Sequence, residues 1–177
     1  MIAFLLAALL PLPFPIEPGA SWWVYREAYA ERRRDVDVIT EDETRYEARG
    51  TRRRVLVVQT GGADPAGTAP IEIGEGFVRL GPWTGEEPLP LPLAVGASRP
   101  GDEEGNAGWV VEAEEEVTVP AGSWKAMRCA LRTWRSESLL WIAPGIGVVR
   151  ETQGAPGQRP EIDRVLLRAS TLPVVSR

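Results

Sequence analysis

The fold is decided by residues 109–134, which read WVVEAEEEVTVPAGSWKAMRCALRTW. In the first half apolar side chains alternate with glutamates, which is the period-two pattern of a strand with one buried face. We expect that face to carry Trp109, Val111, Ala113, Val117 and Val119. Pro120 and Gly122 then favour a tight turn, and the return strand turns Cys129 to the apolar side, as a small buried hydrophobe. The stretch predicts an antiparallel hairpin.

Similar patterns run outward from this hairpin in both directions. The sequence predicts strands at 22–31, 35–48, 52–60, 71–73, 77–80, 109–119, 124–134, 139–143, 148–152 and 162–169. Residues 81–108, rich in Pro and Gly, are expected to be a long connection between two halves of one sheet. The prediction is an all-β fold, a curled antiparallel sheet forming an open half-barrel of about eight to ten strands. We expect a single β domain over residues 21–171, followed by a tail over 172–177.

The N-terminus has the character of a leader. Residues 2–16, IAFLLAALLPLPFPI, are uncharged, and the run is shorter and more broken by proline than the roughly 20 apolar residues of a spanning helix. We interpret residues 1–20 as a signal segment, although no A-x-A-like cleavage site precedes Ser21. The sequence therefore predicts an exported protein of the periplasm, envelope or extracellular space, with no transmembrane span after processing.

Composition narrows the functional classes. The chain has no histidine, one cysteine and a net charge of -5, so a His-dependent catalytic unit, a Cys-cluster zinc site and a disulfide within the chain cannot be built. A basic nucleic-acid footprint is also missing. We expect no enzyme activity, no catalytic residues, no metal, no cofactor and no nucleic-acid partner.

Charged clusters leave alternatives open. The acidic group Glu112, Glu114, Glu115 and Glu116 could serve glycoside hydrolysis or bind calcium, but an exposed strand face protected by charge is the favoured interpretation. Arg52, Arg53 and Arg54, beside Arg45 and Arg49, could form an anion or lipid-headgroup patch. Pairing of these arginines with the acidic residues 41–43 is the more economical expectation.

Aromatic side chains offer the better functional lead. There are seven tryptophans, and a curled sheet can leave a trough lined by such side chains. The candidate lining is Trp23, Tyr25, Trp109, Trp124, Met127 and Trp141. The first hypothesis is a non-catalytic protein that binds an apolar ligand or a lipid. The alternative is a structural or protein-interaction module of the cell envelope, with an envelope protein as its partner.

Four phrases together are characteristic of a known group of sequences. They are PGASWWVY at 18–25, LPLPLAVGAS at 89–98, VTVPAGSWKAMRC at 117–129 and WIAPGIGVVRE at 141–151. In this order they resemble the TapB-like family of uncharacterised bacterial envelope proteins, over roughly residues 16–170. The resemblance implies a secreted or membrane-anchored protein, with a fold similar to the half-barrel of periplasmic lipoprotein carriers. It carries over no catalytic residues.

Overall fold

The structure is a computed structural model that describes residues 16, 18–33, 36–51, 54–60, 68–84, 87–99 and 108–170. Nearly all of the predicted leader and the tail at 172–177 lie outside these residues. Within the described part of the chain, no helix has the length and apolar character needed to cross a membrane.

The described residues form strands almost throughout. The strands are β1 (Trp22–Arg33), β2 (Val36–Thr51), β3 (Arg54–Gln59), β4 (Thr68–Gly74), β5 (Phe77–Leu80), β6 (Leu89–Pro90), β7 (Val110–Val119), β8 (Gly122–Arg132), β9 (Glu137–Ala143), β10 (Gly147–Gly154) and β11 (Ile162–Ala169). One short 3₁₀ helix, η1, covers Gly81–Trp83. Ten of the strands coincide with predicted strands. The eleventh, β6, arises within the segment that was expected to be a connection.

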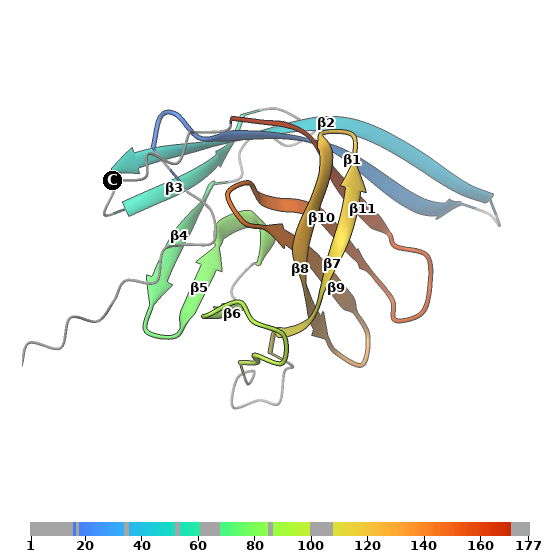
Figure 1. The fold of residues 1–177 in the computed structure, drawn as a ribbon. Helices are drawn as coiled ribbons and strands as arrows, with labels where there is room; N and C mark the ends of the chain where they lie inside the picture. The colour runs from blue at the N-terminus through green and yellow to red at the C-terminus, as the bar shows by residue number, and fades with distance from the viewer. Residues whose placement is uncertain are drawn as a thin grey trace, which may run out of the picture.

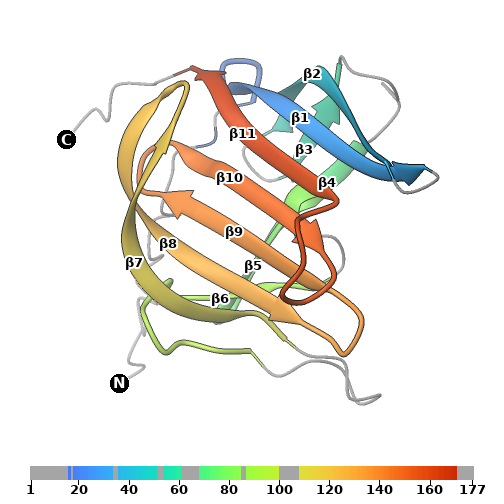
Figure 2. The same ribbon diagram turned by 90° about the vertical axis from the view of Figure 1, so that its right-hand side faces the viewer.

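All the strands join one antiparallel sheet in the order β6-β5-β4-β3-β2-β1-β11-β10-β9-β8-β7. The sheet curls into a nearly closed barrel with one unsealed seam between β6 and β7, as Figures 1 and 2 show. The first and last strands of the chain, β1 and β11, pair with each other and so join the two halves. The predicted fold class is confirmed.

The connection between the halves closes much of the seam. The indole Nε1 of Trp109 donates to the carbonyl of Glu87 at 3.1 Å. The backbone N–H of Val111 donates to the carbonyl of Ala97 at 2.8 Å, and that of Arg99 to the carbonyl of Trp109 at 3.0 Å. This connection therefore covers part of the edge of β7 that would otherwise be unpaired.

Three β-bulges supply the curvature. They interrupt the register between Val24 and Tyr25, between Val111 and Ala113, and between Val148 and Arg150. A bulge bends its strand and shifts the alternation of faces by one residue. Because Val111 pairs with Cys129 but Ala113 pairs with Arg128, these two residues of β7 lie on opposite faces. Val117 and Val119 follow Ala113 without a further register shift, so they share its face. The prediction that Ala113, Val117 and Val119 share the face of Val111 is wrong for this reason.

The turn of the β7–β8 hairpin follows the sequence prediction. Gly122 has φ of +145°, and a Cβ at this position would lie 3.1 Å from the ring of Trp124. A side chain here would meet both backbone strain and a ring contact. Beyond the bulge, Val117 and Val119 are buried because the hairpin tip folds against β10 and β11.

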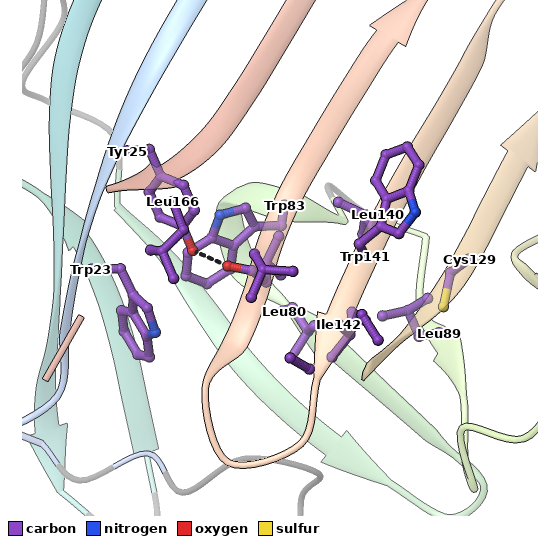
Figure 3. Close-up of a cluster of buried hydrophobic side chains, with 14 of the residues drawn as sticks. Trp23, Tyr25, Leu80, Trp83, Leu89, Cys129, Leu140, Trp141, Ile142 and Leu166 are labelled. Carbon is purple, nitrogen blue, oxygen red and sulfur yellow. Dashed lines mark hydrogen bonds between the residues drawn. The ribbon is translucent and has the colours of Figure 1, made fainter. Parts of the chain in front are cut away.

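An aromatic cluster fills the centre of the barrel (Figure 3). Trp83 of η1 lies against Trp23 at 5.6 Å between ring centroids, against Tyr46 at 5.5 Å and against Tyr25 at 6.1 Å. Tyr25 donates its hydroxyl to the carbonyl of Val148 at 2.7 Å. The aliphatic residues Leu80, Leu89, Leu140, Ile142 and Leu166 pack around these rings. The connection that carries Trp83 thus contributes directly to the core.

Candidate functional site

An apolar groove of about 390 Å³ lies at one end of the barrel. Its wall includes Trp22, Trp124, Ile146, Leu166, Leu167 and Arg168. These residues come from the start of β1, from β8, from the β9–β10 turn and from the end of β11. Segments far apart in the sequence therefore create a single recess.

Hydrogen bonds hold the walls of the groove in place. The backbone N–H of Ala121 donates to the carbonyl of Leu166 at 3.1 Å, which ties the tip of the β7–β8 hairpin to β11. Figure 2 shows this hairpin curling toward that end of β11. The N–H of Trp22 donates to the hydroxyl of Ser170 at 2.9 Å, and beneath the groove Trp23 donates its Nε1 to the carbonyl of Ile146 at 2.9 Å.

A bulge supplies one wall of the groove. On β11, Leu166 pairs with Tyr25 and Arg168 pairs with Val24, so Leu167 has no partner on β1. This extra residue lines the groove. The bulge thus adds an apolar side chain to the recess while leaving the pairing on either side intact.

One arginine, Arg168, lines the groove, and a second, Arg45, lies against the ring of the lining residue Trp22. Arg168 and Arg45 lie directly across from Val24 on the two strands that flank β1. Arg168 pairs with Glu43 at 3.2 Å, and the guanidinium of Arg45 lies 5.0 Å from the ring centre of Trp22. Among the described residues that line it, the recess is therefore apolar except for the guanidinium of Arg168.

The predicted pairing with residues 41–43 is wrong for Arg45 and Arg49, and the side chains of residues 52–54 lie outside the part of the chain that the structure describes. Both arginines pair with Glu47, at 2.9 and 3.1 Å, on their own strand. Residues two apart on a strand point to the same side, which brings these groups together. The hydrogen bonds from Arg49 and Arg45 lower the pKa of Glu47 below its ordinary value.

A second feature, a buried ionic row, crosses the middle of the sheet. Glu27 of β1 pairs in register with Arg164 of β11, and Arg164 pairs with Glu151 of β10. The guanidinium contacts Glu27 at 2.5 Å and also binds Glu151. Both carboxylates are at most 2% exposed. One cation between two anions leaves this row with a formal charge of -1 when all three groups are ionised.

Further donors complete the ionic row. Tyr46 donates its hydroxyl to Glu27 at 3.1 Å and Tyr29 donates to the other oxygen of the same carboxylate. Gln153 donates its side-chain amide to Glu151 at 2.5 Å. Each buried carboxylate thus has at least two donors, which is what a buried charge requires.

Burial shifts the protonation of these groups. Loss of water raises the pKa of Glu151 above its ordinary value, although the nearby guanidinium of Arg164 opposes the rise. For Arg164 itself burial works downward, but the charge of Glu151 and its neighbours leaves the pKa raised. Burial also raises the pKa of Tyr29 to about 12, with help from the hydrogen bond to Glu27. Arg164 therefore stays protonated, whereas burial disfavours the ionised form of Glu151.

The candidate lining residues do not gather in one place. Trp23, Tyr25 and Trp109 are almost fully buried in the core, and Met127 is partly buried against it. Among the six candidates only Trp124 lines the groove, together with Trp22, which was not a candidate. That any of these residues holds a ligand stays a prediction.

The sixth candidate, Trp141, lies across β9 from the core residues Leu140 and Ile142, which point the other way in Figure 3. Its Nε1 donates to Glu115 at 2.5 Å, and Arg150 covers its ring at 5.3 Å from the centroid. Trp141 is therefore buried beneath charged side chains and away from the groove.

The acidic cluster on β7 forms ion pairs along the hairpin. Glu112 pairs with Arg128 at 3.3 Å and with Arg132, and Glu115 pairs with Arg128 at 3.2 Å. Glu114 and Glu116 are exposed. The hydrogen bond from Arg132 lowers the pKa of Glu112. Glu114 and Glu115 are consecutive in the regular register of β7 and so point to opposite sides of the strand. The charges are therefore distributed over both faces, and the expected single charged face is not found.

The lone cysteine lies where the alternation placed it. Cys129 is fully buried on β8, and burial raises the pKa of its thiol to about 12. The prediction of a buried hydrophobe is confirmed.

Two features of interest were missed from the sequence. The groove forms because Trp22, Leu167 and Arg168 line the same recess as Trp124. No local pattern in the sequence indicates that these residues lie together. The ionic row did leave a signal, because Glu27 continues the alternation of Trp23 and Tyr25 toward the core. A charge at the next inward position of an apolar face predicts a buried partner.

Comparison with known proteins bears on the fold. No protein-family model matches the chain, and no curated protein matches its sequence. The TapB-like resemblance therefore stays a prediction based on motifs. The chain is similar in structure to a Bacteroides fragilis protein with a YmcC-like fold that is inferred to be exported. The TM-score is 0.54 and the identity 15%, over 88% of this chain and 97% of the other.

A second solved structure is similar over a comparable length. It is a Parabacteroides distasonis protein inferred to be a lipoprotein, with a TM-score of 0.50 and 13% identity, over 89% of this chain and 97% of the other. Both likenesses extend over nearly the whole chain at low identity, and they show that its fold is similar to the folds of these two proteins, the first of which is YmcC-like.

Proposed function

We propose that the chain is an exported, non-catalytic protein that binds an apolar ligand in the groove at the end of the barrel. The observation that carries this proposal is the groove itself, where Trp22 and Trp124 from opposite halves of the sheet border a volume of about 390 Å³. Ligand pockets typically enclose roughly 300–1,000 Å³ and have mostly apolar walls. The groove has both properties.

The placement of the tryptophans supports binding at this end of the barrel. Both are only partly buried, whereas Trp23, Trp83 and Trp109 are buried in the core. A partly buried indole beside an apolar recess leaves a large surface for a ligand to cover.

Location outside the cytoplasm has separate support. The uncharged segment 2–16 has the length and character of a secretory signal. The two solved structures of similar fold are a protein inferred to be exported and one inferred to be a lipoprotein. Export would bring the groove into contact with envelope lipids and their breakdown products.

Calorimetric titration with dodecanol tests the groove. Trp124→Ala is expected to weaken binding about tenfold, because the variant removes a large apolar contact. Trp134→Ala is the matched control, since Trp134 is 81% exposed and lies outside the groove. Absence of dodecanol binding by the unmodified protein, or equal loss in both variants, would contradict the proposal.

A second candidate, an interaction module, is favoured by a different observation. The β1–β2 hairpin extends beyond the rest of the sheet in Figure 1, and it exposes Tyr29, Val38 and Ile39. Pairing of β2 with β3 begins only at Tyr46. A partner strand could therefore add to the edge of β2 before that residue.

A photo-crosslinking residue at position 39 tests this candidate in intact cells. A discrete crosslinked protein that is lost when the crosslinker is moved to the exposed position 134 would support an interaction surface. Recovery of uncrosslinked monomer alone would argue against it.

A further inference from the structure

The charge of the groove is decided by one residue. Among the described residues that line it, Arg168 is the only ionisable group, and the others are apolar. A ligand whose head carries a positive charge would meet this guanidinium unfavourably. A neutral hydroxyl head could accept one hydrogen bond from it, whereas an anionic carboxylate head would form a stronger hydrogen bond between two charged groups.

Arg45 adds a second cation on the same side. Arg45 and Arg168 lie across from Val24 on opposite flanks of β1, next to Trp22. The carboxylate nearest to Trp22 in the register is Glu47, and it is already engaged by Arg45 and Arg49. The acidic groups at this end of the barrel are therefore partly neutralised.

The ion pair between Arg168 and Glu43 can be broken at little cost in free energy. Arg168 and Glu43 pair at 3.2 Å with side chains 65% and 62% exposed. Exposed ion pairs of this kind contribute little to stability. A carboxylate held in place by an alkyl chain in the groove would compete effectively, because its apolar part fixes its position.

We infer that the groove binds a free fatty acid, with the alkyl chain between Trp22 and Trp124 and the carboxylate at Arg168. This inference rests on the proposed function and adds the chemical class of the ligand. Two N–H groups of the Arg168 guanidinium can donate to the two oxygens of one carboxylate. A fatty alcohol has a single oxygen and cannot accept both hydrogen bonds.

The test compares dodecanoate with dodecanol, which share the same alkyl chain, by calorimetric titration at mildly alkaline pH. The unmodified protein is expected to bind dodecanoate about tenfold more tightly than dodecanol, the scale of a hydrogen bond to a charged group. Arg168→Gln should remove this preference, so that the ratio of the two affinities falls from about tenfold to about one. Arg168→Lys should retain part of the preference. Arg135→Gln, which alters an exposed arginine stacked on Trp134, should behave as the unmodified protein.

The outcomes separate the two proposals. Equal affinity for both ligands would overturn the fatty-acid inference and leave the apolar groove standing. If neither dodecanoate nor dodecanol binds, the fatty-acid inference and the proposed apolar groove are both overturned. Loss of dodecanol binding in Arg168→Gln, with an unchanged circular dichroism spectrum, would show that Arg168 shapes the groove and does not select the head. Sedimentation with anionic phospholipid vesicles in the absence of dodecanoate binding would overturn the inference in favour of a membrane surface.

Discussion

At the scale of single residues, Arg164 is the side chain on which most depends. It lies between Glu27 and Glu151, each almost completely withdrawn from water. The guanidinium also lies 5.6 Å from the ring centre of Tyr46. Two buried anions without their shared cation would repel each other in a poorly solvating interior.

Arg164→Met is therefore expected to lower the free energy of unfolding by about 3–5 kcal/mol, the usual cost of breaking a buried ion pair. Urea denaturation followed by circular dichroism measures the change. Arg150→Met is the comparison, since Arg150 pairs with Asp163 at 3.0 Å where both side chains are more than a third exposed. A loss as small as that of the comparison would contradict the role of Arg164.

The raised pKa of Glu151 predicts how the stability of the folded protein depends on pH. Because burial raises its folded pKa above the unfolded value, its protonated form favours the folded state. That contribution is full below the ordinary carboxyl pKa and is lost as pH rises through the folded pKa. Glu151→Gln cannot ionise and should escape the loss.

We expect the stability of Glu151→Gln relative to the unmodified protein to increase as the pH rises from the ordinary carboxyl value of 4.5 through the raised folded pKa. Urea denaturation of both proteins across this range measures the difference. Taking the difference removes the opposite contributions of Glu47 and Glu112, whose folded pKa values are lowered. A difference that stays constant with pH would show that Glu151 titrates alike in the folded and unfolded states.

At the scale of elements, the β7–β8 hairpin connects the strongest sequence signal with the groove. Its turn brings Ala121 to Leu166 and its return strand delivers Trp124. The sequence was sufficient to place the two strands, because alternation and turn residues are local. The bulge after Val111 was not foreseen, since its position depends on pairing with β8.

Gly122→Ala tests the geometry of this hairpin. The positive φ and the 3.1 Å approach of the Trp124 ring predict a loss of about 1–2 kcal/mol in the free energy of unfolding. Gly145→Ala is the control: its φ is +78°, but nothing lies within 4 Å of the added Cβ. Equal losses in urea denaturation would mean that the contact with Trp124 has no energetic weight.

At the scale of the whole molecule, the two halves of the chain share one core. Trp23, Tyr25 and Trp83 come from the first half, and Leu140, Ile142 and Leu166 from the second. The pairing of β1 with β11 joins them again at the backbone. Neither half buries its apolar residues without the other.

Unfolding is therefore expected to be a single cooperative transition. Tryptophan fluorescence and far-ultraviolet circular dichroism should give coincident curves in urea. Two separated transitions would indicate that the halves are independent units.

The sequence by itself determined the class of the fold, the course of ten strands, their turns and the burial of Cys129. These features follow from the alternation of neighbouring side chains and from the backbone preferences of proline and glycine. Only the tertiary structure decided that β6 would form at the seam, that Glu27, Arg164 and Glu151 would share one row, and that Trp22 would meet Trp124 beside Arg168. The physical reason is that these arrangements depend on register, bulges and closure of the barrel. Closure brings together residues as far apart in the chain as Glu27 and Arg164, or Trp22 and Trp124.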